Sequence, residues 1–571
     1  MTGISRRDVI RGAGAAAGAA AVSSGVTATA SGSPGRTNPD TGAHADLVLT
    51  NGRIHTMDDN ATVVRAVAIR DGRIVAVGNS VPNPGSNGRS INLRGATVVP
   101  GLIESHTHFV SLANRPGHHV AQLELARTIA EVQGFLAARR PDVPEGQFIT
   151  ALGGWHPRQW TEQRLPTLAE LDAAVPDRPV FLLQTFSGPS VTNTLGKQFF
   201  ETVTSPLAGP VTVSPTGAIT SGAQTNAALY HLRVRQTFED KRRSALDAMA
   251  FSAQVGITTV LDQVLPPSPG PLTPNQALSG LDHYRMYDAW LSLHREKKAF
   301  IRLQTNFLHN QGNIPALGDL ANQLPELRER LRHQFPFFGD DMLRTGAIGE
   351  WGAPIGAGAV WQEAQRLIAQ ARWRNENSPG NLAALTQVVT AYEAVNAEFG
   401  ITDLRWGVQH INEATPELLA RLKALNCGVS MSGFRWLQGN PGANPVGPPF
   451  RMIVDSGIPA GMHEDGVHIA PHNPWYALHY ATTGLNALGQ QINPGQQLTR
   501  QEALHSYTRA NAWYLNREDR LGSIEPGKLA DLLVLDRDYF TVSDADMRRT
   551  LPVLTVVGGE IVHDTGALPV R

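Results

Sequence analysis

Two histidines, His106 and His108, are the residues of this chain whose type and spacing point most directly to chemistry. They follow the apolar run at residues 98–103. On a β-strand, residues i and i+2 share one face and lie roughly 6–7 Å apart along the backbone, so both imidazoles can reach one metal ion. A His-x-His pair alone is a weak signal. Its position at the end of an apolar strand strengthens it, because barrel enzymes carry their active sites at the carboxyl ends of their strands.

Two further strand ends offer ligands to the same face. His410 ends the predicted strand at residues 404–411, and Asp465 follows the apolar residues 456–461. Two or three histidines plus one carboxylate, with an open position for water, describe a catalytic site for zinc or a similar divalent ion. The carboxylate of Asp465 would then be the catalytic group that carries the proton. The alternatives are a hydrogen-bonded core histidine at position 410 and a helix cap at position 465.

The middle of the chain must supply the elements that position these residues. Apolar, strand-like segments alternate there with amphipathic helical segments, a pattern typical of a parallel α/β fold. Helices are predicted at 241–255, 381–398, 415–425 and 500–513. Strands are predicted at 102–108, 148–154, 179–185, 257–263, 300–307, 343–349, 404–411, 427–432 and 458–464. These nine candidates bracket the eight strands of a (β/α)8 TIM-type barrel.

Both ends of the mature chain are rich in short β-segments joined by turns such as Asn-Gly and Asp-Gly. Such turns connect hairpins, and strands from two chain ends can pair into one small module. We therefore expect a β-sandwich built from residues 45–98 and 525–571. The metal-dependent barrel would then occupy residues 99–524.

The first thirty residues resemble a twin-arginine export signal. Arg6 and Arg7 precede an Ala/Gly/Val stretch that ends in a small-residue cleavage site at Ala30. The apolar part is shorter than the ~20 residues that a membrane-spanning helix needs, so no stable membrane anchor is expected. Residues 1–30 are thus predicted to be a signal peptide and residues 31–44 a flexible leader. A signal of this kind predicts that the protein is exported to the periplasm or the cell exterior. The alternative interpretation of these residues is a disordered basic N-terminus.

Composition narrows the classes of partner. A formal net charge of −1 over 571 residues provides no electrostatic footprint for nucleic acid, so a small-molecule substrate is favoured. Cys427 is the only cysteine, which excludes an intrachain disulfide and a cysteine-based metal site. It is interpreted as a buried small hydrophobic residue. A homodimer is the expected assembly only because it is the commonest one.

Several longer motifs resemble the amidohydrolase superfamily, specifically the family 3 branch that includes N-substituted formamide deformylase. They lie at residues 45–48, 51–54, 100–108, 165–167, 170–172, 256–260 and 522–532. The resemblance implies a metal-bearing barrel, a flanking β-sandwich and hydrolysis of an amide, cyclic amide or N-acyl C–N bond. It also implies that His106, His108, His410 and Asp465 are metal ligands.

The chain departs from this pattern at two places. Family members often carry a carboxylated lysine on a middle strand, but residues 343–350 contain no lysine. Glu350 is the candidate replacement ligand; the alternative is a loop glutamate paired with an arginine. No histidine lies between Glu350 and His410, where another strand-end ligand is usual. We therefore expect one ion, zinc by preference, with two as the alternative.

Three more side chains are candidates for substrate contact. His463 shares the strand face of Asp465, and Trp155 and Trp351 would supply apolar pocket walls, with core packing as the alternative. The neighbouring histidines at 468, 472 and 479 are expected in loops or polar pairs. A deaminase of the same superfamily, a metal-dependent esterase or phosphotriesterase, and an inactive exported binding protein are the competing functions.

Overall fold

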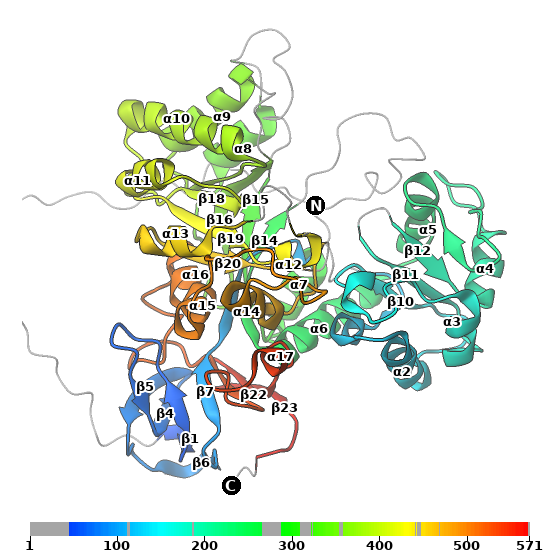
Figure 1. Cartoon of the computed structure of the whole chain (residues 1–571), viewed down its shortest axis with the longest axis horizontal. Coiled ribbons are helices and arrows are strands. Elements are labelled where there is room, and N and C mark those ends of the chain that lie inside the picture. Colours follow the sequence, from blue (N-terminus) through cyan, green and yellow to red (C-terminus); the bar gives the residue numbers. More distant parts are fainter. Residues whose placement is uncertain are drawn as a thin grey trace, which may run out of the picture. The chain divides into compact units, whose positions relative to one another are not determined.

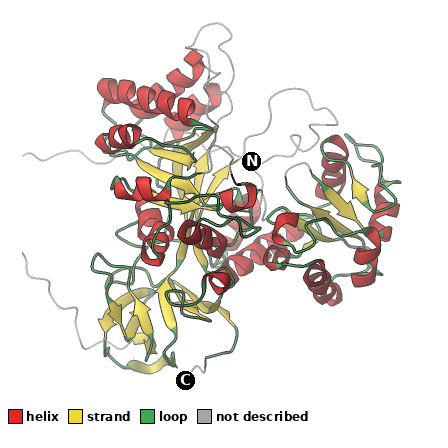
Figure 2. Cartoon of the chain, viewed as in Figure 1, coloured by secondary structure: helices red, strands yellow, loops and turns green. Residues whose placement is uncertain are grey.

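The computed structural model describes residues 45–110, 115–185, 188–264, 287–308, 321, 324–352, 358–439, 441, 447–466 and 469–568. The chain divides into two units, residues 1–42 and 43–571, and every described residue belongs to the second. The predicted signal peptide (1–30) and leader (31–44) lie outside the described residues. Figures 1 and 2 show the arrangement of the helices and strands.

Eight parallel strands form the central barrel, in the order β20-β19-β18-β17-β16-β15-β14-β8. They are β8 (Leu102–Thr107), β14 (Ile257–Val264), β15 (Arg302–Phe307), β16 (Leu343–Gly352), β17 (Asn375–Ser378), β18 (Gly407–Ile411), β19 (Gly428–Ser432) and β20 (Ala460–His463). The first and last strands are bridged by Asn511, whose Nδ2 donates to Ile103 O at 2.6 Å and to Met462 O at 2.8 Å. The predicted TIM-type barrel is therefore confirmed.

Helices alternate with these strands, as a barrel of this kind requires. They include α6 (Phe238–Val255), α7 (Tyr287–Arg295), α8 (Pro325–His333), α9 (Gly358–Gln370), α10 (Leu382–Phe399), α11 (Pro416–Ala424) and α13 (Phe450–Asp455). Helix α11 begins after Thr415, whose side chain accepts from Leu418 N, and has Pro416 in its first turn, as predicted. The helix predicted at 500–513 is instead two helices, α15 (Arg500–Tyr507) and α16 (Arg509–Tyr514), because Thr508 leaves the helical conformation.

Two of the nine strand candidates are strands but do not belong to the barrel. Residues 148–154 and 179–185 contain β10 (Ile149–Leu152) and β11 (Val180–Leu183), which belong to a separate five-stranded sheet between β8 and β14. Its other strands are β9 (His118–His119), β12 (Ser190–Thr192) and β13 (Ala218–Ile219). Conversely, the barrel strand β17 was missed because its sequence, Asn-Glu-Asn-Ser, is entirely polar, although all four residues are buried.

Strands from both chain ends pair in one module, as expected. One sheet has the order β5-β4-β1-β6 and the other β23-β22-β21-β7-β2-β3. The first half supplies β1 (Ala45–Thr50), β2 (Arg53–His55), β3 (Val63–Val64), β4 (Ala66–Arg70), β5 (Arg73–Gly78), β6 (Pro84–Asn92) and β7 (Thr97–Pro100). The second half supplies β21 (Leu532–Leu535), β22 (Pro552–Val557) and β23 (Glu560–Asp564). The two halves join where β21 pairs antiparallel with β7.

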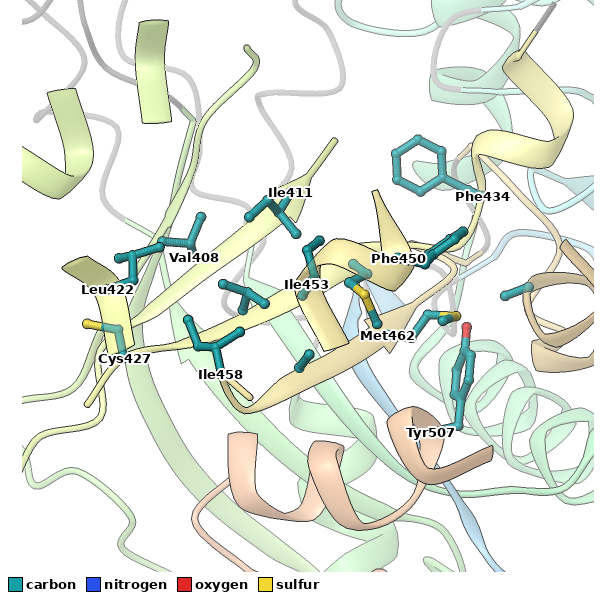
Figure 3. Close-up of a cluster of buried hydrophobic side chains, with 14 of the residues drawn as sticks. Val408, Ile411, Leu422, Cys427, Phe434, Phe450, Ile453, Ile458, Met462 and Tyr507 are labelled. Atoms are coloured by element: carbon teal, nitrogen blue, oxygen red, sulfur yellow. The ribbon is translucent and has the colours of Figure 1, made fainter. Parts of the chain in front are cut away.

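A continuous apolar core supports the later barrel strands (Figure 3). Cys427 lies in it, fully buried and in the same cluster as Val408 and Leu422, and burial raises the pKa of its thiol to about 12. The interpretation of Cys427 as a small core residue agrees with this position. Among the described residues, no helix has the length and apolar character needed to cross a membrane.

Candidate metal centre

His106 and His108 leave the end of β8 on the same face, as their spacing predicts. Their ring centroids are 5.5 Å apart and the rings are perpendicular. His108 Nδ1 lies 2.9 Å from Gln263 O, and a carbonyl oxygen can only accept, so Nδ1 carries the proton. The other nitrogen, Nε2, is thereby left facing the carboxylates.

Two carboxylates from other strands face these histidines. Glu350 Oε2 lies 3.1 Å from His106 Nε2 and 3.9 Å from His108 Nε2. Asp465 Oδ1 lies 3.6 and 3.8 Å from the same two nitrogens. The second oxygen of each carboxylate faces His410 Nε2, at 3.1 Å from Glu350 and 3.7 Å from Asp465. Four strands thus bring their ends to one point.

His410 and Asp465 reach this point because the backbone turns at both residues. Each has a left-handed conformation, with φ of 49° at His410 and 52° at Asp465. Strict strand alternation would send Gln409 and His410 to opposite faces, and the turn lets both side chains approach His106. Conformations of this kind are unfavourable for residues with a Cβ and gather at functional sites.

His463 joins the same cluster. Its Nε2 lies 3.1 Å from His410 Nδ1, and its Nδ1 lies 2.7 Å from Ser430 Oγ. Burial, with the neighbouring His410 and His106, lowers its pKa well below the usual value. His463 is therefore a neutral imidazole beside the ligands.

The cluster has unusual electrostatics. Burial lowers the pKa of His106, but the Glu350 and Asp465 carboxylates outweigh it and raise the pKa to about 10. Burial likewise raises the pKa of Glu350, and His106 with His410 brings it well below the usual range. These shifts mean that the carboxylates favour a positive charge at this point, which a proton or a metal ion can provide.

The donor set fits a divalent ion. Two triads place their ligand atoms within 4.8 Å of one another: His106, His108 and Asp465, and His106, Glu350 and His410. Tetrahedral zinc with bonds of about 2.0–2.2 Å separates its ligand atoms by roughly 3.3–3.6 Å, close to the contacts seen here. Asp465 Oδ1 is buried and has no hydrogen-bond partner among the described residues. Such an orphaned acceptor is expected where a cation binds.

Below the centre lies a pair of buried carboxyl groups that sequence reasoning did not single out. Glu104 Oε1 accepts from His106 N at 3.3 Å, and its Oε2 accepts from Glu464 N at 3.2 Å. Burial raises the pKa of Glu104 to about 8 and that of Glu464 well above the usual value. These groups connect the first and last barrel strands directly beneath the ligands.

Two other candidates are placed differently. Trp155 is buried in the inserted sheet, where it stacks on Trp160 at 5.1 Å and donates through Nε1 to Ala151 O at 3.2 Å. No hydrogen bond or ring contact joins Trp155 to the cluster among the described residues. Trp351 belongs to β16, and its side chain lies outside the described residues, as does His468. His472 makes a polar pair, with Nε2 3.0 Å from Ser252 Oγ.

Two residues that the sequence did not single out, Gln409 and Glu376, are connected to His106 by hydrogen bonds. Gln409 Oε1 forms a short hydrogen bond with His106 Nδ1, and Gln409 Nε2 donates a second short one to Glu376 Oε2. The available signal was the polar strand β17 itself. Four consecutive polar residues between two helices have no reason to be buried unless they hydrogen-bond inside a barrel.

Comparisons with known proteins identify the family of the chain. A model described as "Amidohydrolase family" matches residues 89–563. The chain is 24% identical to N-substituted formamide deformylase of Arthrobacter pascens, over 91% of this chain and 98% of that protein. It is 25% identical to Protein LONG AFTER FAR-RED 3 of Arabidopsis thaliana, over 92% and 93% of the two chains.

Solved structures share the fold. An uncharacterized metal-dependent hydrolase from Pyrococcus horikoshii aligns with a TM-score of 0.55 and 20% identity, covering 87% of this chain and 99% of that one. Atrazine chlorohydrolase from Arthrobacter aurescens, solved with zinc, aligns with a TM-score of 0.51 and 18% identity, covering 91% and 95%. With a family model that spans most of its length, this chain belongs to the amidohydrolase family.

Proposed function

We propose that this protein hydrolyses a C–N bond of a small molecule, in an amide, cyclic amide or N-acyl compound, by means of metal-activated water. The observation that carries the proposal is the convergence of three histidines and two carboxylates at the carboxyl end of the barrel. The unpaired Oδ1 of Asp465 in that cluster is a further sign that a cation belongs there.

One ion is favoured over two. Both triads use Nε2 of His106, and a neutral imidazole nitrogen has one lone pair, so the two triads cannot be filled independently. We assign the ion to His106, His108 and Asp465, with Glu350 and His410 within reach. Zinc is the proposed metal because the ligands are nitrogen and carboxylate oxygen, and because a structural neighbour was solved with zinc.

Each residue then has a chemical task. A bound divalent ion would lower the pKa of a coordinated water and polarise the scissile carbonyl. Asp465 accepts the proton of the attacking water and returns it to the leaving nitrogen. Through its Nε2 contact, His463 holds the ring of His410 in place, and Glu350 makes the centre favourable to positive charge.

Amide hydrolysis is preferred to the alternatives because one of the relatives that match nearly the whole chain is, by its name, a deformylase of N-substituted formamides. A deaminase would use the same centre but release ammonia. A catalytically inactive exported binding protein would keep the fold without turnover. For location, we propose export by the twin-arginine route, on the strength of the motif at residues 5–11, which lie outside the described structure.

The test is a screen of N-formyl, N-acyl and cyclic amides with metal-free and zinc-reconstituted enzyme. Zinc-dependent release of a carboxylic acid and an amine supports the proposal. Release of ammonia alone would move the deaminase to the front. Zinc binding without turnover of any amide would favour the binding protein.

A further inference from the structure

A buried carboxylate on β17, that of Glu376, is connected to the metal centre through a single side chain, Gln409. Glu376 is 1% exposed, and the hydrogen bonds that its side chain accepts from the described residues all come from N–H groups. Its Oε2 accepts from Gln409 Nε2, from Asn306 Nδ2 at 2.7 Å and from Gln263 Nε2 at 3.3 Å; its Oε1 accepts from Arg374 Nε at 3.1 Å. Burial raises the pKa of Glu376, and the Arg374 guanidinium opposes that rise.

The orientation of the amides around Glu376 is determined by their other partners. Asn306 Oδ1 accepts from Ala347 N at 2.7 Å, so its NH2 group must face Glu376. Gln409 donates to the same carboxylate oxygen through Nε2, which leaves its Oε1 facing His106 Nδ1. An amide oxygen cannot donate, so His106 Nδ1 must carry a proton.

We infer that Glu376, acting through Gln409, is a positioning residue that holds His106 in the tautomer with Nδ1 protonated and Nε2 free for a metal ion. The inference rests on the proposed metal centre and goes beyond it. His108 obtains the same tautomer from a backbone carbonyl, Gln263 O, whereas His106 depends on two side chains. Partners of this kind typically change metal affinity by about 10–100-fold when removed.

The sharpest variant is Glu376→Gln, which keeps the shape but introduces an NH2 group. Its single oxygen accepts from the charged Arg374 guanidinium, so the NH2 group faces Gln409, which can turn its own amide over and present Nε2 to His106 Nδ1. His106 would then move its proton to Nε2, the nitrogen that faces Glu350 and Asp465. We expect zinc affinity, measured by competition with a chromophoric chelator on full-length metal-free protein, to fall by about 10–100-fold.

A double variant, Glu376→Gln with Gln409→Glu, provides the rescue. The carboxylate at 409 accepts from His106 Nδ1 and from the new amide at 376, so the required acceptor returns. Zinc affinity should recover to within about threefold of wild type. The matched control is Glu124→Gln. Glu124 is also a buried carboxyl, and burial raises its pKa to about 8, but it does not belong to the Glu376–Gln409–His106 connection. This variant should bind zinc like wild type.

Thermal melting of the metal-free proteins separates positioning from folding. Equal zinc affinity in wild type and folded Glu376→Gln would contradict the positioning role of Glu376. A folded double variant that still binds zinc weakly would contradict it as well. Should Glu376→Gln fail to fold, Gln409→Met carries the test. It removes both the acceptor at His106 Nδ1 and the donor to Glu376, while Asn306, Gln263 and Arg374 still donate to that carboxylate, and it should weaken zinc binding in the same way. A wild type that binds no zinc would overturn the proposed function instead.

Discussion

At the amino end of the barrel, a buried arginine and a buried aspartate form an ion pair. At the carboxyl end, two buried carboxylates face histidines and have no arginine or lysine partner among the described residues. Arg302, the first residue of β15, donates to both oxygens of Asp531 at 2.7 Å, and Gly558 N donates to Asp531 Oδ1 at 2.8 Å. At the other end, Glu350 and Asp465 face histidines, and Asp465 Oδ1 lacks a hydrogen bond within the described chain.

The difference separates groups that stabilise the fold from groups that serve a ligand. The Arg302–Asp531 pair joins the barrel to the β-sandwich and needs nothing from outside the chain. The carboxylates at the opposite end carry charge that only a proton or a metal ion can balance. Substitutions at the two ends should therefore have opposite signatures, one in stability and the other in metal binding and activity.

The largest effect is expected from Asp465→Asn. Loss of the carboxylate removes the proposed proton carrier and one ligand, so kcat/KM on the best amide should fall by about a thousandfold. The free energy of unfolding of the metal-free protein should not decrease, because the substitution replaces a buried charged group, one oxygen of which has no hydrogen bond in the described chain, with a neutral amide of similar size. Near-normal turnover in this variant would show that Asp465 has no catalytic role.

Arg302→Met should give the reverse result. It leaves Asp531 buried without its partner, and the free energy of unfolding in urea should fall by about 3–5 kcal/mol. Zinc per folded chain should be unchanged. The double variant with Asp531→Asn removes both charges and should recover part of the loss; zinc loss in the folded single variant would contradict the separation of the two ends.

Glu350→Gln tests the replacement of the missing lysine. The substitution keeps the volume but removes the negative charge that faces His106 and His410 at 3.1 Å. Zinc affinity should fall about tenfold, by analogy with other partners of metal ligands. Unchanged zinc affinity would show that Glu350 does not take part in metal binding.

The sequence predicted the barrel and the proximity of four polar residues, but not which segments form the barrel strands. His106, His108, His410 and Asp465 end up together because strand ends of a parallel barrel share one rim, which spacing and apolar runs already indicate. Strand β17 escaped prediction because apolar periodicity cannot identify a strand made of Asn375, Glu376, Asn377 and Ser378. The strands β10 and β11 of the inserted sheet could not be told from barrel strands because they are equally apolar.

Long-range contacts were also beyond the sequence. Nothing in residues 404–410 indicates that Gln409 and His410 both point inward; that depends on the left-handed backbone at His410. The hydrogen bonds from Gln409 to His106 and Glu376 join residues 303 and 33 positions apart, which only the closed barrel brings together.

The smallest effect concerns pH and the β-sandwich. Burial, then Arg53, lowers the pKa of His55 to about 4, and its ring stacks on Phe540 at 3.8 Å. Because the unfolded value is near 6.5, the stability from neutral His55 is complete above that pH and is lost as pH falls toward 4. His55→Gln should reduce the drop in Tm between pH 7 and pH 5 by on the order of 1 °C. An unchanged drop would mean that His55 is not a buried neutral histidine.

The most direct measurement of the metal centre is the zinc content per chain of purified protein, compared between wild type and His106→Ala/His108→Ala after reconstitution. We expect about one equivalent in wild type and none in the variant, because the proposed ion uses both histidines. Two equivalents in wild type would contradict the shared role of His106 Nε2. Absence of zinc from reconstituted wild type, or equal zinc in the variant, would contradict the metal centre itself.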